Sequence, residues 1–214
     1  AIQAFVYAFT FIGGVFADKI LGFKKSLVFG GIVMAAGNLL IAFDPNTFFF
    51  WGITMSIVGT GFFKPNISTM VGALYQSGDV RRDAGFGLFY SGINLGSFLG
   101  GIVCVYLGKY VSWSYAFLAA SIVMVIGLII FLLIKKSLGD IGESPLKAMH
   151  KSKRKKREIA VYAGAILSLP LIYLMIDNTS YTDIFMMIIG PAALIYFFLE
   201  LRKVEGSPAK KKLL

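Results

Sequence analysis

Lys64 is the residue whose type and position point most directly to chemistry. It lies near the middle of the apolar run 47–75. As an α-helix this run would be about 43 Å long, which exceeds the hydrocarbon core of a bilayer. An ionisable side chain at that depth is costly, so a functional role is the default interpretation. The structural alternative is a lysine that snorkels to the interface, but snorkelling occurs near helix ends. Pro65 cannot donate to the carbonyl of Gly61 and predicts a kink beside the lysine.

A buried ammonium group requires a nearby negative charge or a lowered pKa. All eleven carboxylates of the sequence lie in loops or at the ends of apolar runs, and none is expected at the depth of Lys64. We therefore expect that Lys64 is neutral at rest, or that its acidic partner comes from outside this sequence.

Polar residues follow a helical spacing in three apolar runs. The run 84–108 has a polar and aromatic stripe made of Phe86, Tyr90, Asn94, Ser97 and Gly101. The run 1–17 has a similar stripe made of Gln3, Tyr7, Thr10 and Gly14. On one face of the run 47–75 lie Thr60, Lys64 and Ser68. Three such faces predict a shared water-filled cavity, with hydrogen bonding between helices as the alternative role of Tyr90 and Asn94.

Glycines recur every four residues on the other side of the run 84–108, at Gly92, Gly96 and Gly100. Small residues at this spacing let another helix approach closely. We expect this side to pack against protein and the Tyr90/Asn94 side to face water.

The sequence offers few groups for metal binding or catalysis. His150 is the only histidine and Cys104 the only cysteine, which excludes an internal disulfide and a zinc site of ordinary ligand count. The apolar runs contain only Lys64, Cys104 and hydroxyl groups as candidates for catalysis, so we expect neither an enzyme nor a cofactor.

The composition indicates a membrane protein. Hydrophobic residues make up 57% and charged residues 15% of the 214 residues, against about 25% charged in soluble proteins. Seven apolar runs are bounded by charges or turn residues, and an all-α polytopic membrane protein follows from them. These runs are 1–17, 26–43, 47–75, 84–108, 112–134, 159–176 and 184–199.

Lysine and arginine set the orientation. With alternating loops, nineteen of the 21 fall on one side and only Lys109 on the other, with Lys64 inside a span. We expect loops 18–25, 76–83 and 135–158 and the tail 201–214 in the cytoplasm of a cell with an inner membrane. The basic stretch Lys151–Arg157 lacks interleaved aromatic residues, so we expect it to attract anionic lipid headgroups rather than nucleic acid.

Three motifs carry a resemblance to a known family. The segment 13–25, GGVFADKILGFKK, resembles the loop between the second and third helices of the major facilitator superfamily, with Gly22 in a tight turn and Asp18 among cations. GTGFFKPNIS (59–68) resembles the fourth-helix motif of proton-coupled oligopeptide transporters. FYSGINLGSF (89–98), preceded by DVRRDAGFG (79–87), resembles their fifth-helix motif.

The resemblance implies a domain organisation. Residues 1–134 would be helices 2–6 of a six-helix bundle, 135–158 a basic linker, 159–200 an accessory hairpin at the periphery, and 201–214 a basic tail. The first helix and the C-terminal bundle would lie outside this sequence.

The resemblance also implies proton-driven symport of di- and tripeptides across the inner membrane by alternating access. Tyr7, Lys64, Tyr90 and Asn94 would bind the peptide, and Lys64 would couple it to protons through a carboxylate of the first helix. Structural or gating roles would fall to Gly14, Asp18, Gly22, Pro65, Gly92 and Gly96. A non-transporting scaffold or sensor of the same fold, and a symporter for nitrate or another small solute, remain alternatives.

Overall fold

The computed structural model describes residues 2–76 and 78–178, together with residues 187, 188, 190, 191, 194, 195 and 198. The regular structure of these residues is entirely helical, which confirms the predicted fold class. The elements are α1 (Ile2–Phe16), the π-helical turn η1 (Ala17–Leu21), α2 (Phe23–Phe43), α3 (Pro45–Ala73), α4 (Arg81–Tyr110), α5 (Trp113–Ile134), the short 3₁₀ helices η2 (Lys135–Leu138) and η3 (Pro145–Ala148), and α6 (Lys151–Asp177).

Local sequence sets the helix boundaries. Asp44 caps α3 by accepting hydrogen bonds from the N–H groups of Asn46 (3.0 Å) and Thr47 (3.4 Å), and Pro45 occupies the first helical position. The hydrogen bond from the Thr47 side chain lowers the pKa of Asp44 because it favours the carboxylate form. Ser112 caps α5 by accepting from the N–H of Ser114 at 3.2 Å.

Helices α2 and α3 are packed backbone to backbone. A Cβ atom placed on Gly30 would lie 2.5 Å from the carbonyl oxygen of Gly59, and one on Gly52 would lie 2.5 Å from that of Gly37. Two glycine pairs therefore let the helices approach over several turns, as small residues do between membrane helices.

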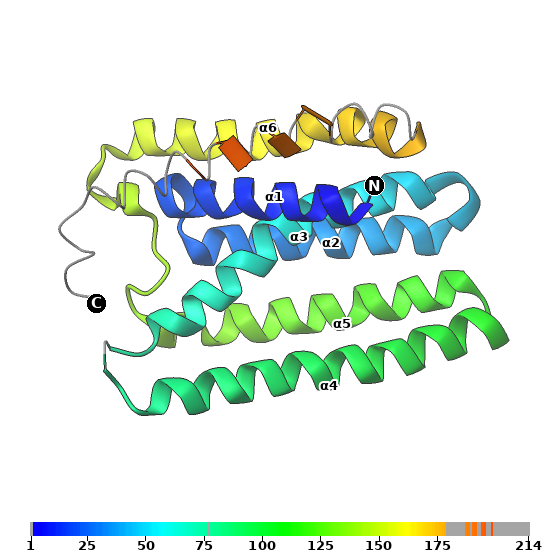
Figure 1. Ribbon diagram of the computed structural model, residues 1–214, viewed down its shortest axis with the longest axis horizontal. Helices are drawn as coiled ribbons and strands as arrows, with labels where there is room; N and C mark the ends of the chain where they lie inside the picture. Colours follow the sequence, from blue (N-terminus) through cyan, green and yellow to red (C-terminus); the bar gives the residue numbers. More distant parts are fainter. Residues whose placement is uncertain are drawn as a thin grey trace.

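The helices follow one another across the molecule in the order α6, α1, α3 with α2, α5 and α4 (Figure 1). The C-terminal part of α3 leaves the middle layer and crosses toward the beginning of α4 (Figure 1). Helix α5 is held on α2 by a hydrogen bond from Ser121 to the carbonyl of Ala35 (2.9 Å) and by Leu128 against Gly31.

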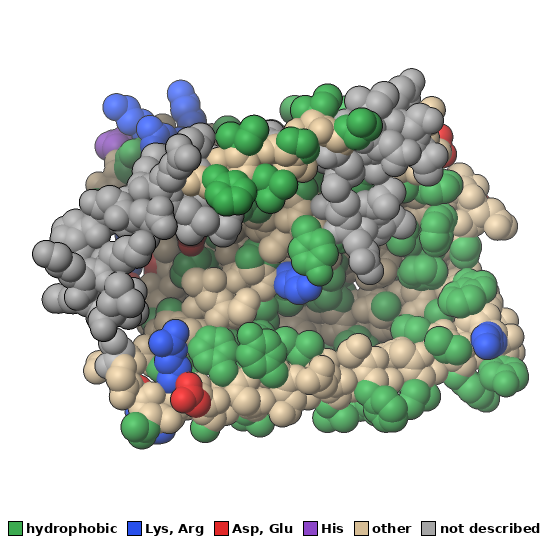
Figure 2. Space-filling view, in the orientation of Figure 1, with side chains coloured by type: hydrophobic (Ala, Val, Ile, Leu, Met, Phe, Trp, Pro, Cys, Tyr) green, Lys and Arg blue, Asp and Glu red, His purple; other side chains and the backbone are tan. Residues whose placement is uncertain are grey.

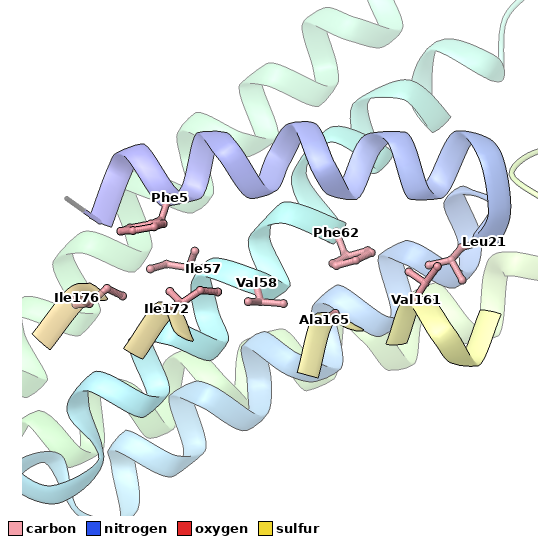
Figure 3. Packing of buried hydrophobic residues seen from close by; sticks show 9 residues of the cluster. All are labelled: Phe5, Leu21, Ile57, Val58, Phe62, Val161, Ala165, Ile172 and Ile176. Carbon is pink, nitrogen blue, oxygen red and sulfur yellow. The ribbon is translucent and has the colours of Figure 1, made fainter. Parts of the chain in front are cut away.

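Helix α6 lies at the edge of the described molecule, but one face of it belongs to the buried core. Its side chains Val161, Ala165, Ile172 and Ile176 point toward residues of α1, η1 and α3 (Figure 3). The facing core residues are Phe5, Leu21, Ile57, Val58 and Phe62. Helix α6 is therefore packed on the bundle by one face, and the expectation that the hairpin 159–200 is an accessory, peripheral element stays a prediction. The second half of the expected hairpin and the tail 201–214 lie outside the described elements.

Helix α4 contrasts with the other helices because none of its residues is buried. The first turns of α4 contact the last turn of α3, where the Phe86 ring lies 3.4 Å from a Cβ placed on Gly72. Farther along, no atom lies within 4 Å of a Cβ placed on Gly92, Gly96 or Gly100. The close helix packing expected on this side is absent from the part of the chain that the structure describes.

Four described helices are long and apolar enough to cross a bilayer: α2, α4, α5 extended to Leu138, and α6. Helix α3 has 29 residues and carries Lys64 in its interior. Each of these helices overlaps an apolar run that the sequence marks as a span. The ends of the helices and runs agree to within four residues, except that α6 begins at Lys151 and not after residue 158.

Candidate functional site

The structure brings Lys64 of α3 and Tyr7 of α1 together. The ammonium nitrogen of Lys64 lies 5.9 Å from the centre of the Tyr7 ring, within the range of a cation–π interaction. Both side chains are exposed, Tyr7 at 69% of its surface. Lys64 forms no ion pair with any residue that the structure describes, so its positive charge is available to another group.

A close helix crossing positions this pair. Pro65 leaves the carbonyl of Gly61 without its usual helical donor, and a Cβ placed on Gly13 of α1 would collide with that carbonyl oxygen. In return, a Cβ placed on Gly61 would lie 2.6 Å from the carbonyl oxygen of Phe9. Because α1 and α3 touch here, residues one or two turns away on each helix lie close to each other.

The hydroxyl groups beside Lys64 are engaged by their own helix. Thr60 donates to the carbonyl of Ser56 (2.7 Å) and also lies 3.7 Å from the sulfur of Met34 on α2. Ser68 donates to the carbonyl of Lys64 at 3.1 Å. Thr60 therefore turns toward α2, and the expected shared face of Thr60, Lys64 and Ser68 is only partly open.

A second group of side chains, which includes Phe86 and Tyr90, lies on α4 and is separate from the pair of Lys64 and Tyr7. The rings of Phe86 and Tyr90 are stacked with centroids 6.2 Å apart, and the guanidinium of Arg82 lies 5.8 Å from the Phe86 ring. Phe86 touches α3 at Gly72, so this face of α4 turns toward α3. The molecule is hollowed between α4 and the helices of the middle layer (Figure 2).

Tyr90 and Asn94 are exposed, Tyr90 at 55% of its surface. Within the described ranges no hydrogen bond, ion pair or ring contact joins either residue to Lys64 or Tyr7. The structure therefore brings together two of the four expected peptide-binding residues and leaves the other two on the facing helix.

Gly22 adopts the backbone conformation that the motif 13–25 requires. Its φ is +79° and ψ 158°, a region essentially restricted to glycine, and its N–H donates to the carbonyl of Ala17 at 2.9 Å. Asp18 is exposed in η1 and forms no ion pair within the described chain. The expectation that cations surround Asp18 is therefore not met there.

The cations of this turn pair instead with two acids that the sequence interpretation left unassigned. Lys24 lies 3.2 Å from Glu143, and Lys25 lies 2.6 Å from Glu158. The residue pairs are 119 and 133 positions apart. The only signal in the sequence is the occurrence of two glutamates within a strongly basic segment, and that signal does not name their partners.

The described residues contain no group of three or more His, Cys, Asp or Glu side chains that could hold a metal ion. Cys104 is half-buried and its thiol lies 3.8 Å from the carbonyl oxygen of Ala116.

Comparisons with known proteins place these features in a family. A family model described as the POT family matches residues 24–157. The chain is 44% identical over 122 residues to the peptide transporter YePEPT of Yersinia enterocolitica, covering 56% of this chain and 24% of that protein. It is 28% identical over 214 residues to dipeptide and tripeptide permease A of Cronobacter turicensis, covering 99% and 42%.

Solved structures agree in fold. A structure of tetrameric PepTSo2 superposes with a TM-score of 0.79 at 28% identity and covers 99% of this chain and 47% of that chain. A mutant peptide transporter POT in complex with alafosfalin gives a TM-score of 0.74 at 33% identity and covers 92% and 41%. The chain thus spans less than half the length of these relatives.

Proposed function

The chain belongs to the POT family, and on this premise we propose that the whole protein carries di- and tripeptides across the cytoplasmic membrane, driven by protons. The names of two relatives support the substrate class: one is a peptide transporter and the other a dipeptide and tripeptide permease. A neighbour in fold binds alafosfalin.

The pair of Lys64 and Tyr7 is the observation that carries the proposal. A free peptide ends in a carboxylate and an ammonium group. A lysine suits the carboxylate, and the face of a tyrosine ring suits the ammonium group. The Tyr90 hydroxyl and the Asn94 amide on the facing helix supply donors and acceptors for the peptide group. We assign peptide binding to these four residues.

Proton coupling is assigned to Lys64. Its ammonium group has no carboxylate partner in the described ranges, and a lone charge among membrane helices is costly. We propose that a carboxylate from a helix preceding this sequence pairs with Lys64, and that binding of proton and peptide releases the pair. Alternating access of two helical bundles around the site would then move both solutes.

The distribution of charge supports an orientation. Basic side chains gather at the end of the molecule where α4 and α6 begin (Figure 2). By the positive-inside rule this end faces the cytoplasm. Loops 18–25, 76–83 and 135–158 and the tail 201–214 are therefore proposed to be cytoplasmic.

Counterflow tests the proposal. Liposomes containing the full-length protein are loaded with unlabelled dialanine, and labelled dialanine is added outside without a proton gradient. We expect labelled peptide to enter, and we expect entry to stop when unlabelled tripeptide is added outside in excess. A scaffold or sensor would give no entry. Liposomes loaded with nitrate test the other alternative, because a nitrate symporter would exchange nitrate and not dialanine.

A further inference from the structure

A basic cleft lies at the end of the bundle where α2 begins and α5 ends. Its volume is about 580 Å³, and it opens between α2, α5, the segment that follows α5, and α6. Its rim carries Lys24, Lys25, Lys135 and Lys136. Lys64 and the other proposed peptide-binding residues do not line it.

The charges around this cleft do not cancel. Glu143 is the only carboxylate among its lining residues and pairs with Lys24. Glu158 pairs with Lys25 but is shared with Arg154, at 3.6 Å.

Lys135 and Lys136 pair with no carboxylate in the described part of the chain. The neighbouring Asp140 is occupied by Lys147 at 2.5 Å, and that ion pair holds the pKa of Asp140 below its ordinary value. An excess of positive charge therefore remains on the side where Lys135 and Lys136 lie.

The inner wall of the cleft is apolar. Val28 and Ile32 continue along α2 from the lysines, and Leu132 lies on the last turns of α5. Ile32 is 54% exposed and Leu132 39% exposed. A row of apolar side chains thus leads from the basic rim along two helices that are long and apolar enough to span a bilayer.

We propose that this cleft is a binding site for an anionic phospholipid. The phosphate lies against Lys135 and Lys136, and one acyl chain lies along Ile32 and Leu132. Free phosphate would bind the lysines but leave the apolar wall uncovered. A basic rim next to an apolar wall therefore favours a lipid. Basic pockets between membrane helices on the cytoplasmic side are suited to such headgroups, because that leaflet is rich in anionic lipid.

The site lies at a structural joint. The segment after α5 is clasped to the α1–α2 turn by a hydrogen bond from Lys24 N–H to the Gly142 carbonyl (3.0 Å) and one from the Ser144 hydroxyl to the Ile20 carbonyl (2.5 Å). A lipid that bridges Lys135 and Lys136 to α2 would strengthen this joint, so lipid binding is expected to raise the melting temperature.

Lipid binding to the purified full-length protein tests the site. Native mass spectrometry counts retained phosphatidylglycerol and phosphatidylcholine, and thermal unfolding in detergent records the shift caused by each lipid and by inorganic phosphate. We expect preferential retention of phosphatidylglycerol. The double variant Lys135→Gln/Lys136→Gln should lose about thirtyfold in affinity, because each lysine near an anionic headgroup contributes about fivefold.

Two further variants separate the possible outcomes. Lys19→Gln/Lys109→Gln removes two exposed charges that do not line the cleft and should retain the lipid; equal loss in this control would mean general attraction and overturn the site. Ile32→Ser should weaken lipid retention without changing the response to phosphate. A phosphate effect as large as that of the lipid, or equal retention of phosphatidylcholine, would also overturn the proposal. Because no transport is measured, failure here leaves the proposed function untouched.

Discussion

At the scale of single residues, the turn between α1 and α2 depends on the absence of a side chain at Gly22. Its φ of +79° is one that side chains rarely permit, and a Cβ there would lie 2.5 Å from the backbone carbonyl carbon of Glu143. Gly22 thus permits the turn and also leaves room for the backbone of Glu143, in the segment after α5, to pack against it.

Gly22→Ala is expected to destabilise the full-length protein by more than the backbone strain alone, which is about 1–3 kcal/mol. Gly78→Ala is the matched control, because Gly78 has φ +85° but nothing within 4 Å of its Cβ position. Thermal unfolding in detergent measures both. Equal losses of melting temperature would show that the contact with Glu143 contributes nothing.

The sequence is informative about single residues where one residue has a strong conformational or electrostatic preference. The conformational freedom of glycine predicts a turn at Gly22, which the structure confirms. The depth of Lys64 in an apolar run predicts a functional position, which stays a prediction. The pairing of Lys24 with Glu143 was not predictable, because it depends on how distant segments fold together. For the same reason, the contact between Lys64 and Tyr7 does not follow from their separate polar stripes.

At the scale of elements, the crossing of α1 and α3 sets the position of the candidate site. Gly13 lies against the Gly61 carbonyl that Pro65 leaves without a helical donor. At such a close approach, the Cα–H group of Gly13 can donate a weak hydrogen bond to the Gly61 carbonyl oxygen.

Gly13→Ala should force the two helices apart and cost about 1–3 kcal/mol of stability, as overpacking does in other cores. Gly14→Ala serves as its neighbour control, because a Cβ there would lie 3.9 Å from the Pro65 side chain, an ordinary contact. Melting temperatures of the two purified variants decide the point. A Gly13 variant as stable as the Gly14 variant would contradict the close crossing.

Helix α4 provides a test of facing. In a protein whose Cys104 is replaced by serine, single cysteines at Tyr90 and Asn94 should react with a water-soluble thiol reagent in membranes, and dialanine should protect them. Cysteines at Gly92 and Gly96 should react slowly, because we expect other helices of the whole protein to cover them. Rapid, unprotected labelling at Gly92 and Gly96 with none at Tyr90 would mean that the faces are reversed.

The apolar runs predicted α2 to α5 well because charges and caps bound each of them. They placed the start of the next helix too late. Helix α6 begins within the basic stretch, at Lys151. Lysine and arginine are good helix formers, so a helix continues where hydropathy ends. The packing of α6 on α1 and α3 required the three-dimensional structure.

At the scale of the whole molecule, the described helices match part of longer relatives. The chain spans 42% of a dipeptide and tripeptide permease and 47% of a solved relative. Helix α4 buries none of its residues, and its Tyr90 and Asn94 are exposed. Transport is therefore a property to be measured on the full-length protein.

Proton-driven accumulation by a Lys64→Ala variant tests the account most directly. Liposomes containing the full-length protein receive labelled dialanine under an inward proton gradient, and the same preparations are assayed for counterflow without a gradient. We predict that wild type and the control Lys109→Ala accumulate dialanine. Lys64→Ala should not accumulate it but should retain a weakened counterflow at raised dialanine concentration, because Tyr7, Tyr90 and Asn94 still bind the peptide. Accumulation by Lys64→Ala at the wild-type level would contradict the coupling role of Lys64.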